Sequence, residues 1–179
     1  MRDGYTDFHA EKALQDIFAT HDLIWRVVIK AWIPAVKEPL SLTREDEKRP
    51  DGATLIPWAQ GKPLARDVTV PDTFASSHLP NTSLTAGAAA DKAAVSETAK
   101  YENLRGPHFF FPVAMVTWRP WNAQATELIQ EIGRRLTIVT SNSLETQYLF
   151  QRIFITIQRG NEVAFQNTFT TERSCSEFT

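Results

Sequence analysis

The sequence predicts an α/β domain in which helices cover a mixed β-sheet. Three observations indicate this class: a helical apolar periodicity near the N-terminus, short β-prone segments between residues 35 and 71, and an apolar segment that follows an alanine-rich helix. With two more helical segments after these, the expected order is helix, three strands, helix, strand, helix, helix. That order is typical of an α/β sandwich.

The first helix is expected over residues 10–32, which contain neither glycine nor proline. Its apolar residues recur at spacings of three, four and seven, and they are Leu14, Phe18, Trp25, Val28 and Trp32. Pro34 then ends the helix. Residues 35–42 follow as a short extended segment, and the almost wholly charged run 43–52 is expected to be a solvated loop.

Two strands are expected at 53–58 and 64–71, joined by the turn 60–63. In the second strand, alternation places Asp67 and Thr69 on one face with Ala65, and it places Arg66, Val68 and Val70 on the other. A loop rich in Ser, Thr and Pro leads from this strand to an alanine-rich helix over 88–104, which ends near Gly106.

The most β-prone segment of the chain is 108–118, where Pro112 favours an edge strand or a bulge. Asn122 resembles the N-cap of a helix that reaches Leu136. A last helix is expected over 143–159, ending at Gly160. The alternation of Ile153, Ile155 and Ile157 would also suit a strand, so both alternatives stay open.

The composition matches one soluble globular domain of 179 residues, with 42% hydrophobic and 22% charged residues. The net charge of -2 gives no general footprint for nucleic acid, so DNA binding would need a local patch. Cys175 is the only cysteine, which excludes an intrachain disulfide and indicates a reducing compartment. With no signal-like segment and no long apolar run, we expect no membrane partner.

Asp51 and Asp67 are the candidate site residues, because a hairpin-like connection would bring them together. Two neighbouring carboxylates repel unless a cation lies between them. Mg²⁺ is suited to that place and supports phosphodiester hydrolysis. The alternative for Asp51 is structural, since an aspartate before Gly52 is a favoured turn residue. Asp67 is harder to explain in that way, because it interrupts an otherwise apolar strand.

Four elements in this order have a counterpart in a known family: Glu38-Pro39, Arg49-Pro50-Asp51-Gly52, Asp67-Val68-Thr69-Val70 and Lys100-Tyr101. They resemble the restriction-like endonuclease domain of non-LTR retrotransposon polyproteins, within the PD-(D/E)xK nuclease superfamily. The similarity runs from about residue 21 to about residue 169 and includes Pro120-Trp121-Asn122, 131–136 and 158–161. One domain over 1–179 is therefore expected, with a divergent segment at about 1–9 and a flexible tail at about 170–179.

The resemblance implies a restriction-endonuclease-like fold, with a central mixed β-sheet flanked by helices and a metal site at one edge. It implies that Asp51 and Asp67 bind Mg²⁺ or Mn²⁺, with Glu38 as an optional further ligand. In the wider superfamily a lysine stands two residues after the second acid, where this chain has Thr69. The retrotransposon branch takes its lysine from the following helix, which here is Lys100.

The implied function is metal-dependent DNA endonuclease activity of the target-site nicking type, and a nuclear location would follow from that role. A structure-selective nuclease acting on branched DNA would share these residues. The alternative from another class is a catalytically inactive remnant that binds DNA or a protein. Departures from the family pattern favour the remnant: Glu97 in place of a lysine, Arg66 before the second acid, Val116, and Thr20-His21.

Three lesser features complete the candidate sites. The spacing of three puts Glu97 on the helical face of Lys100, so the two are expected to pair. Arg134, Arg135, Arg152 and Arg159 could contact phosphates if one surface gathers them, or they could be ordinary solvated arginines. His21 and His108 lack the partner spacing of a zinc site.

Overall fold

The chain folds as a mixed α/β structure around a four-stranded sheet with strand order β1-β2-β3-β4. The computed structural model describes residues 18–70, 88–115 and 121–174, with side chains described as far as residue 159. The strands are β1 (Ala35–Lys37), β2 (Gly52–Thr54), β3 (Leu64–Thr69) and β4 (Phe109–Ala114). β1 pairs with β2 and β2 pairs with β3 in antiparallel orientation, while β4 lies parallel to β3. The sheet is therefore mixed, as predicted.

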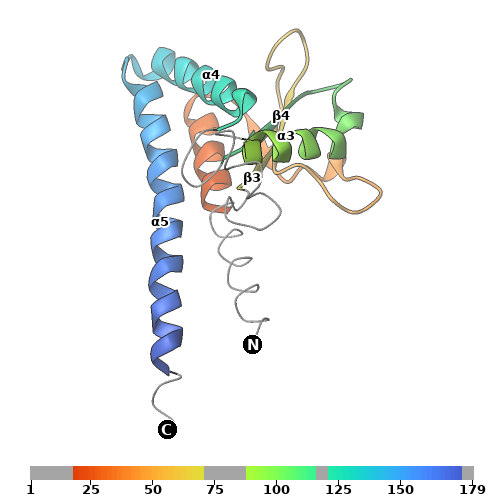
Figure 1. Cartoon of the computed structure of the whole chain (residues 1–179). Helices are drawn as coiled ribbons and strands as arrows, with labels where there is room; N and C mark the ends of the chain where they lie inside the picture. The colour runs from red at the N-terminus through yellow and green to blue at the C-terminus, as the bar shows by residue number, and fades with distance from the viewer. Residues whose placement is uncertain (1–17, 71–87, 116–120, 175–179) are drawn as a thin grey trace.

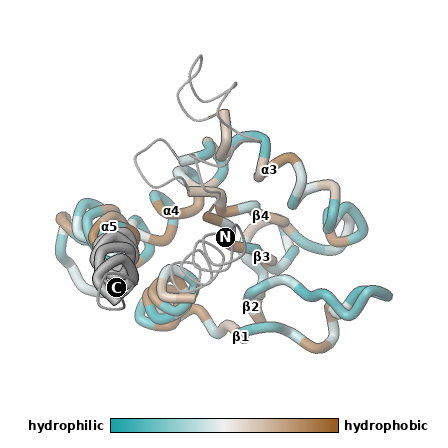
Figure 2. Tube along the Cα trace, turned by 60° about the horizontal axis from the view of Figure 1, so that its bottom comes forward, coloured by the Kyte–Doolittle hydropathy of each residue, from teal (hydrophilic) through white to brown (hydrophobic). Residues whose placement is uncertain are grey.

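Helices cover both faces of this sheet (Figures 1 and 2). They are a helix at 18–30, α3 (Ala88–Lys100), α4 (Ala123–Thr140) and α5 (Glu145–Ser174). Figure 2 shows α3 on one side of the strands and α4 and α5 on the other. The expected order of elements is confirmed in the described ranges, with short 3-10 turns added after β1 and α3.

Alternation along the inner strands explains why both faces are covered. Leu64 and Val68 of β3 join the main core, with the helix at 18–30, α4 and α5. Ala65 lies on the opposite face, where it packs against Tyr101. The alanines of α3 allow a close approach to Ala114 of β4 on that same face. β3 is therefore buried on both sides, although it carries Arg66 and Asp67.

The first helix buries a stripe that only partly matches the predicted one: Val28 is buried and Trp25 is partly buried. Phe18 and Trp32 are 60% and 81% exposed, and Leu14 lies outside the described residues. The buried residues of this helix and its end are Leu23, Ile24, Val27, Val28 and Ala31. Both stripes have helical spacing, so periodicity alone cannot choose between them. The helix ends before Pro34, where Trp32 has a positive φ of 61°.

The turn before β3 follows from local chemistry. Gln60 and Gly61 have φ angles of 46° and 75°, and Ala59 and Lys62 pair across them. Two consecutive positive φ values are the signature of a type I′ hairpin turn. β2 is shorter than predicted, because it pairs with β1 over three residues and with β3 over only two.

Pro112 lies in β4, an edge strand, as its missing amide requires. Asn122 precedes α4 but does not cap it with its side chain. Its Oδ1 accepts from the Ala114 amide at 3.0 Å, and its Nδ2 donates to the Pro112 carbonyl at 3.0 Å. The predicted N-cap position of Asn122 is therefore confirmed, but its side chain extends the hydrogen bonding of β4 and does not cap the helix.

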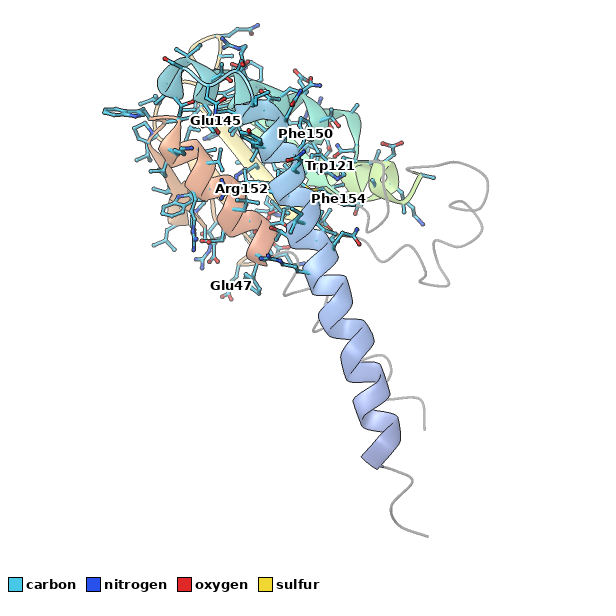
Figure 3. The ribbon with its side chains drawn as sticks, turned by 90° about the vertical axis from the view of Figure 1, so that its left-hand side faces the viewer. Glu47, Trp121, Glu145, Phe150, Arg152 and Phe154 are labelled. Atoms are coloured by element: carbon cyan, nitrogen blue, oxygen red, sulfur yellow. The ribbon has the colours of Figure 1, made fainter. Side chains whose placement is uncertain are left out.

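The two last helices are longer than predicted. α4 continues past Leu136 to Thr140. α5 is helical throughout the isoleucine alternation, so the strand alternative is excluded. It also passes through Gly160, where the predicted end is wrong, and continues beyond the sheet in Figure 1. A single glycine weakens a helix without ending it. Near its start, α5 stacks Phe150 on Trp121 with ring centroids 5.0 Å apart (Figure 3).

Several predictions concern residues outside the described ranges: the helix before residue 18, the loop 71–87, Val116, Pro120 and Cys175. No helix in the described ranges combines the length and apolar character needed to cross a membrane.

Candidate functional site

The structure brings Asp51 and Asp67 together on the two inner strands of the sheet. Asp51 immediately precedes β2, and the pairing of Gly52 with Arg66 places Asp67 beside it. The Asp51 amide donates to Asp67 Oδ1 at 3.1 Å, and the Val68 amide donates to Asp51 Oδ2 at 2.7 Å. Each carboxylate is therefore fixed by the backbone next to the other. Both strands are inner strands of the sheet, and Asp51 lies directly before the first residue of β2.

Lys100 joins these acids from α3. Its Nζ donates to Asp67 Oδ2 at 3.1 Å and to Glu97 Oε2 at 3.0 Å. The predicted pairing of Glu97 with Lys100 is therefore present, and Asp67 shares the same ammonium. α3 can supply these groups because it covers the face of β3 that carries Asp67.

Tyr101 contacts the same cluster through its hydroxyl and its ring. It is fully buried, and its hydroxyl donates to Asp67 Oδ1 at 3.5 Å. Its ring packs on Phe110 with centroids 5.0 Å apart, while Lys100 Nζ lies 4.6 Å from the ring centroid. Such a position favours the ammonium form of the lysine. Tyr101 thus contacts both Asp67 and the lysine that binds it.

The cluster shifts the acidity of its members. Burial, a hydrogen bond with Glu97 and the charge of Asp51 raise the pKa of Asp67 to about 7, against the lowering effect of Lys100. Burial and the charge of Asp67 raise the pKa of Tyr101 to about 12. Burial lowers the pKa of Lys100, but Asp67 and Glu97 raise it more, so it ends above its usual value. Asp67 is thus protonated more readily than an ordinary aspartate.

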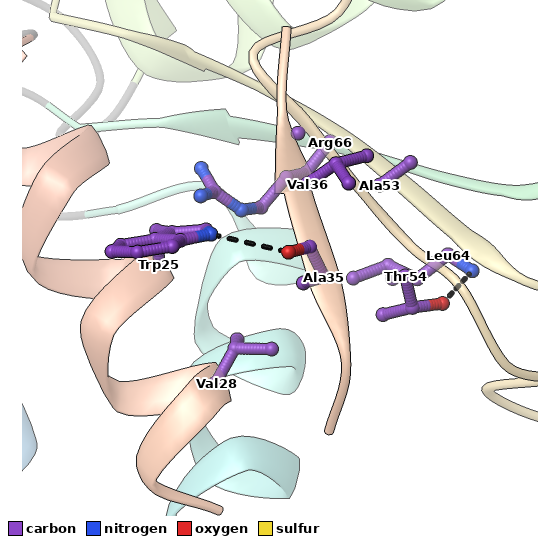
Figure 4. A pocket seen from close by; sticks show the side chains of 9 residues that line it. Trp25, Val28, Ala35, Val36, Ala53, Thr54, Leu64 and Arg66 are labelled. Atoms are coloured by element: carbon purple, nitrogen blue, oxygen red, sulfur yellow. Dashed lines mark hydrogen bonds between the residues drawn. The ribbon is translucent and has the colours of Figure 1, made fainter. Parts of the chain in front are cut away.

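Arg66 lies on the other face of β3, away from Asp67. It is 3% exposed, and its Nη2 donates to the His21 carbonyl at 3.4 Å. Within the described part of the chain, Arg66 Nη1, His21 Nε2 and Thr20 Oγ1 have no hydrogen-bond partner. Arg66 and Trp25 line a cavity (Figure 4). Its volume is about 10 Å³, roughly the size of one water. Burial lowers the pKa of Arg66 to about 10, partly offset by the two aspartates.

Gly52 lies where the Arg66 side chain and the backbone of β1 leave little room for a side chain. A Cβ at this position would lie 3.2 Å from Arg66 Nη2 and 3.3 Å from the Val36 carbonyl oxygen. The Asp-Gly pair thus has a packing reason in addition to any role of Asp51.

The carboxylate of Glu38 is paired with Arg49. Its Oε2 accepts from Arg49 Nη2 at 2.6 Å and from Nε at 3.2 Å. Its backbone amide donates to the Asp51 carbonyl at 2.9 Å, so the residue supports the chain at Asp51 through its main chain. A role as third ligand would require the carboxylate to leave Arg49.

The candidate phosphate-binding arginines are partly engaged inside the protein. Arg134 and Arg135 both bind Glu131 at 2.7 Å. Arg135 also donates to the Trp58 carbonyl at 2.8 Å and lies 3.8 Å from its ring centroid. Arg152 lies on α5, a different helix (Figure 3). Arg135 therefore has a structural role that the sequence did not reveal.

Asp51 and Asp67 suit a divalent cation only together with other ligands. Among the described residues, no three His, Cys, Asp or Glu side chains form a metal-binding group. Mg²⁺ is commonly held by one or two carboxylates, with waters and substrate phosphates completing its octahedron. Two adjacent carboxylates, one of them incompletely compensated, fit that donor set.

Arg44 is the residue of this region that sequence reasoning missed. It donates through Nη1 to the Lys100 carbonyl, and its guanidinium carbon lies 5.7 Å from the Tyr101 ring centroid. It was concealed in a run in which nearly every residue is charged.

No protein-family model matches the chain, and no curated protein matches it significantly.

Proposed function

We propose that the chain is a metal-dependent DNA endonuclease of restriction-like type, derived from a retrotransposon and suited to target-site nicking. The observation that carries this proposal is the convergence of Asp51, Asp67 and Lys100 from three separate elements. Two acids beside a lysine form a site for phosphodiester hydrolysis. Action on chromosomal targets would require a nuclear location.

Asp51 and Asp67 would hold Mg²⁺ or Mn²⁺, which supplies an activated water and neutralises charge developing on the phosphate. The protein groups then have separate tasks. The Asp51 amide and Tyr101 hydroxyl fix one oxygen of Asp67, and Lys100 approaches the other. The Lys100 ammonium is thereby positioned to stabilise the phosphate or to orient the attacking water.

The electrostatics support a cation at this place. Burial raises the pKa of Asp67 most, Glu97 and Asp51 raise it further, and Lys100 offsets these effects only in part. An excess of carboxylate charge in a half-buried site favours binding of a further positive charge. The mixed sheet with helices on both faces also supports the restriction-like assignment.

Nicking of supercoiled plasmid in the presence of Mg²⁺ or Mn²⁺ tests the proposal. The purified chain is expected to nick the plasmid, Asp51→Ala to abolish nicking, and EDTA to do the same. Asp91→Ala is the matched control, because Asp91 is an exposed acid in the first turn of α3. Nicking that survives in Asp51→Ala would remove Asp51 from the mechanism.

The second candidate is an inactive remnant that keeps the fold and binds DNA or a protein. One observation favours it: Lys100 already bridges Asp67 and Glu97, so the chain carries its own cation at the proposed metal position. Glu97→Lys separates the candidates. If only this variant nicks, the natural chain is a remnant damaged at position 97. If the unsubstituted chain nicks, the remnant is rejected.

A further inference from the structure

The charged run before β2 is a mostly exposed loop, as predicted, and it is closed by backbone hydrogen bonds. The Arg44 amide donates to the Lys48 carbonyl at 2.8 Å, and the Glu47 amide donates to the Arg44 carbonyl at 3.1 Å. Arg44 Nε also lies 3.2 Å from Asp46 Oδ1. The loop is thus closed by its own backbone, and it leads directly into Asp51.

Arg44 fastens this loop to the C-terminal end of α3. Its Nη1 donates to the carbonyl oxygen of Lys100, the last residue of the helix. The last carbonyls of a helix lack intrahelical partners and carry partial negative charge, so a cation is stabilising there. The guanidinium also lies over the Tyr101 ring. One side chain therefore contacts both residues that reach Asp67 from α3.

These contacts connect the two halves of the proposed site. The loop supplies Asp51, while the end of α3 supplies Lys100 and Tyr101, and Arg44 joins the two segments. We propose that Arg44 is a positioning residue, which holds the end of α3 so that Lys100 and Tyr101 stay against Asp67. This inference rests on the proposed function, since it assigns Arg44 a part in cleavage.

The geometry requires arginine and not merely a positive charge. A guanidinium presents several donors in a rigid fork, so Nη1 can bind Lys100 while Nε faces Asp46. A lysine at position 44 would offer a single ammonium on a flexible stem. Arg44→Lys is therefore expected to rescue only part of the effect of Arg44→Ala, and it also serves as the variant that preserves the charge for folding.

Hydrogen exchange provides a readout that does not need activity. The amides of Tyr101 and Leu104 donate to Glu97 and Tyr101 carbonyls at the end of α3. Their exchange is expected to rise about tenfold in Arg44→Ala, the change that follows from losing one hydrogen bond to a charged group. The matched control is Lys48→Ala, which removes an exposed cation from the same loop without a contact to α3.

Nicking kinetics then separate positioning from DNA contact. Arg44→Ala is expected to lower kcat about tenfold with an unchanged KM for DNA, and Lys48→Ala is not expected to lower kcat. Unchanged exchange in Arg44→Ala, or a rise in KM alone, would overturn the inference while leaving a nicking enzyme in place. Absence of nicking by the unsubstituted chain would instead overturn the proposed function, and the role of Arg44 in cleavage with it.

Discussion

Replacing Asp67 by asparagine is expected to stabilise the fold at pH 8 and to change its stability little near pH 4. The reason is the position of the carboxyl group, which is 6% exposed and surrounded by Asp51 and Glu97. Asparagine keeps the shape of the side chain and mimics its protonated form. The substitution therefore removes the cost of ionising this group inside the folded protein.

The magnitude follows from the pKa. The folded state raises the pKa of Asp67 from 3.8 to about 7, and each unit corresponds to about 1.4 kcal/mol. Below pH 4 both folded and unfolded chains carry the proton, and above pH 7 both have lost it. Between these values the folded state binds more protons, so its stability falls as pH rises. The accumulated difference is at most about 4 kcal/mol.

Urea unfolding of the natural chain and Asp67→Asn, at several pH values from 4 to 8 in EDTA, measures this difference. Comparing the two chains matters because other groups titrate too. Arg134 and Arg135 lower the pKa of Glu131 from 4.5 to about 2. The stabilisation that the ionised Glu131 provides is therefore lost as the pH falls from 4.5 towards about 2. Both chains share that effect, and it cancels in the comparison.

The difference in the free energy of unfolding between the two chains is expected to increase as pH rises from 4 to 7 and then to stay constant. Asp91→Asn, at an exposed position, is the control and should show no such gap. A gap that is the same at pH 4 and pH 8 would refute the reasoning, because it would mean that Asp67 ionises as easily in the folded chain as in the unfolded one.

Two further substitutions test the packing around the site. Asn122→Ala should destabilise the fold by about 1–3 kcal/mol for each buried group left unpaired, here the Ala114 amide and the Pro112 carbonyl, as measured by urea unfolding. Gly133→Ala should cost about 1–3 kcal/mol in the same assay, because its Cβ would lie 2.8 Å from the Thr146 Cα and force α4 from α5.

Matched controls exist for both substitutions. Asn103→Ala removes an exposed asparagine, and Gly106→Ala adds a Cβ where no atom lies within 4 Å. Both controls should stay within about 0.5 kcal/mol of the natural chain. If Gly133→Ala matches Gly106→Ala, α4 and α5 are not packed as closely as described.

The parts of the fold that could be predicted depend on local chemistry. The alternation in β3 follows from the period of a strand, and the turn at Gln60 and Gly61 follows from the need for positive φ. A hairpin-like connection predicts that Asp51 and Asp67 lie close together, but the turn does not set their register. Ala59 pairs with Lys62 at the turn, whereas Ala53 pairs with Ala65 in the strands, so the β2 side has three more residues between the two pairings.

The parts that could not be predicted depend on tertiary contacts. Two stripes of the first helix have helical spacing, and only the packed sheet selects the one that contains Ile24. Asn122 has the sequence position of a cap, but the open edge of β4 competes for its amide. Arg44 looks like one charge among many until α3 is placed against the loop. The role of such a residue cannot be read from the sequence, because the sequence gives its charge but not the group that it contacts in the fold.

The central claim is that Asp51 and Asp67 together bind a divalent cation. Calorimetric titration of Mn²⁺ into the natural chain, Asp67→Ala and Asp91→Ala tests it without any need for DNA. The account predicts one site per chain, retained in Asp91→Ala and weakened at least about tenfold in Asp67→Ala. Equal binding by all three chains, or no binding by the natural chain, would contradict it.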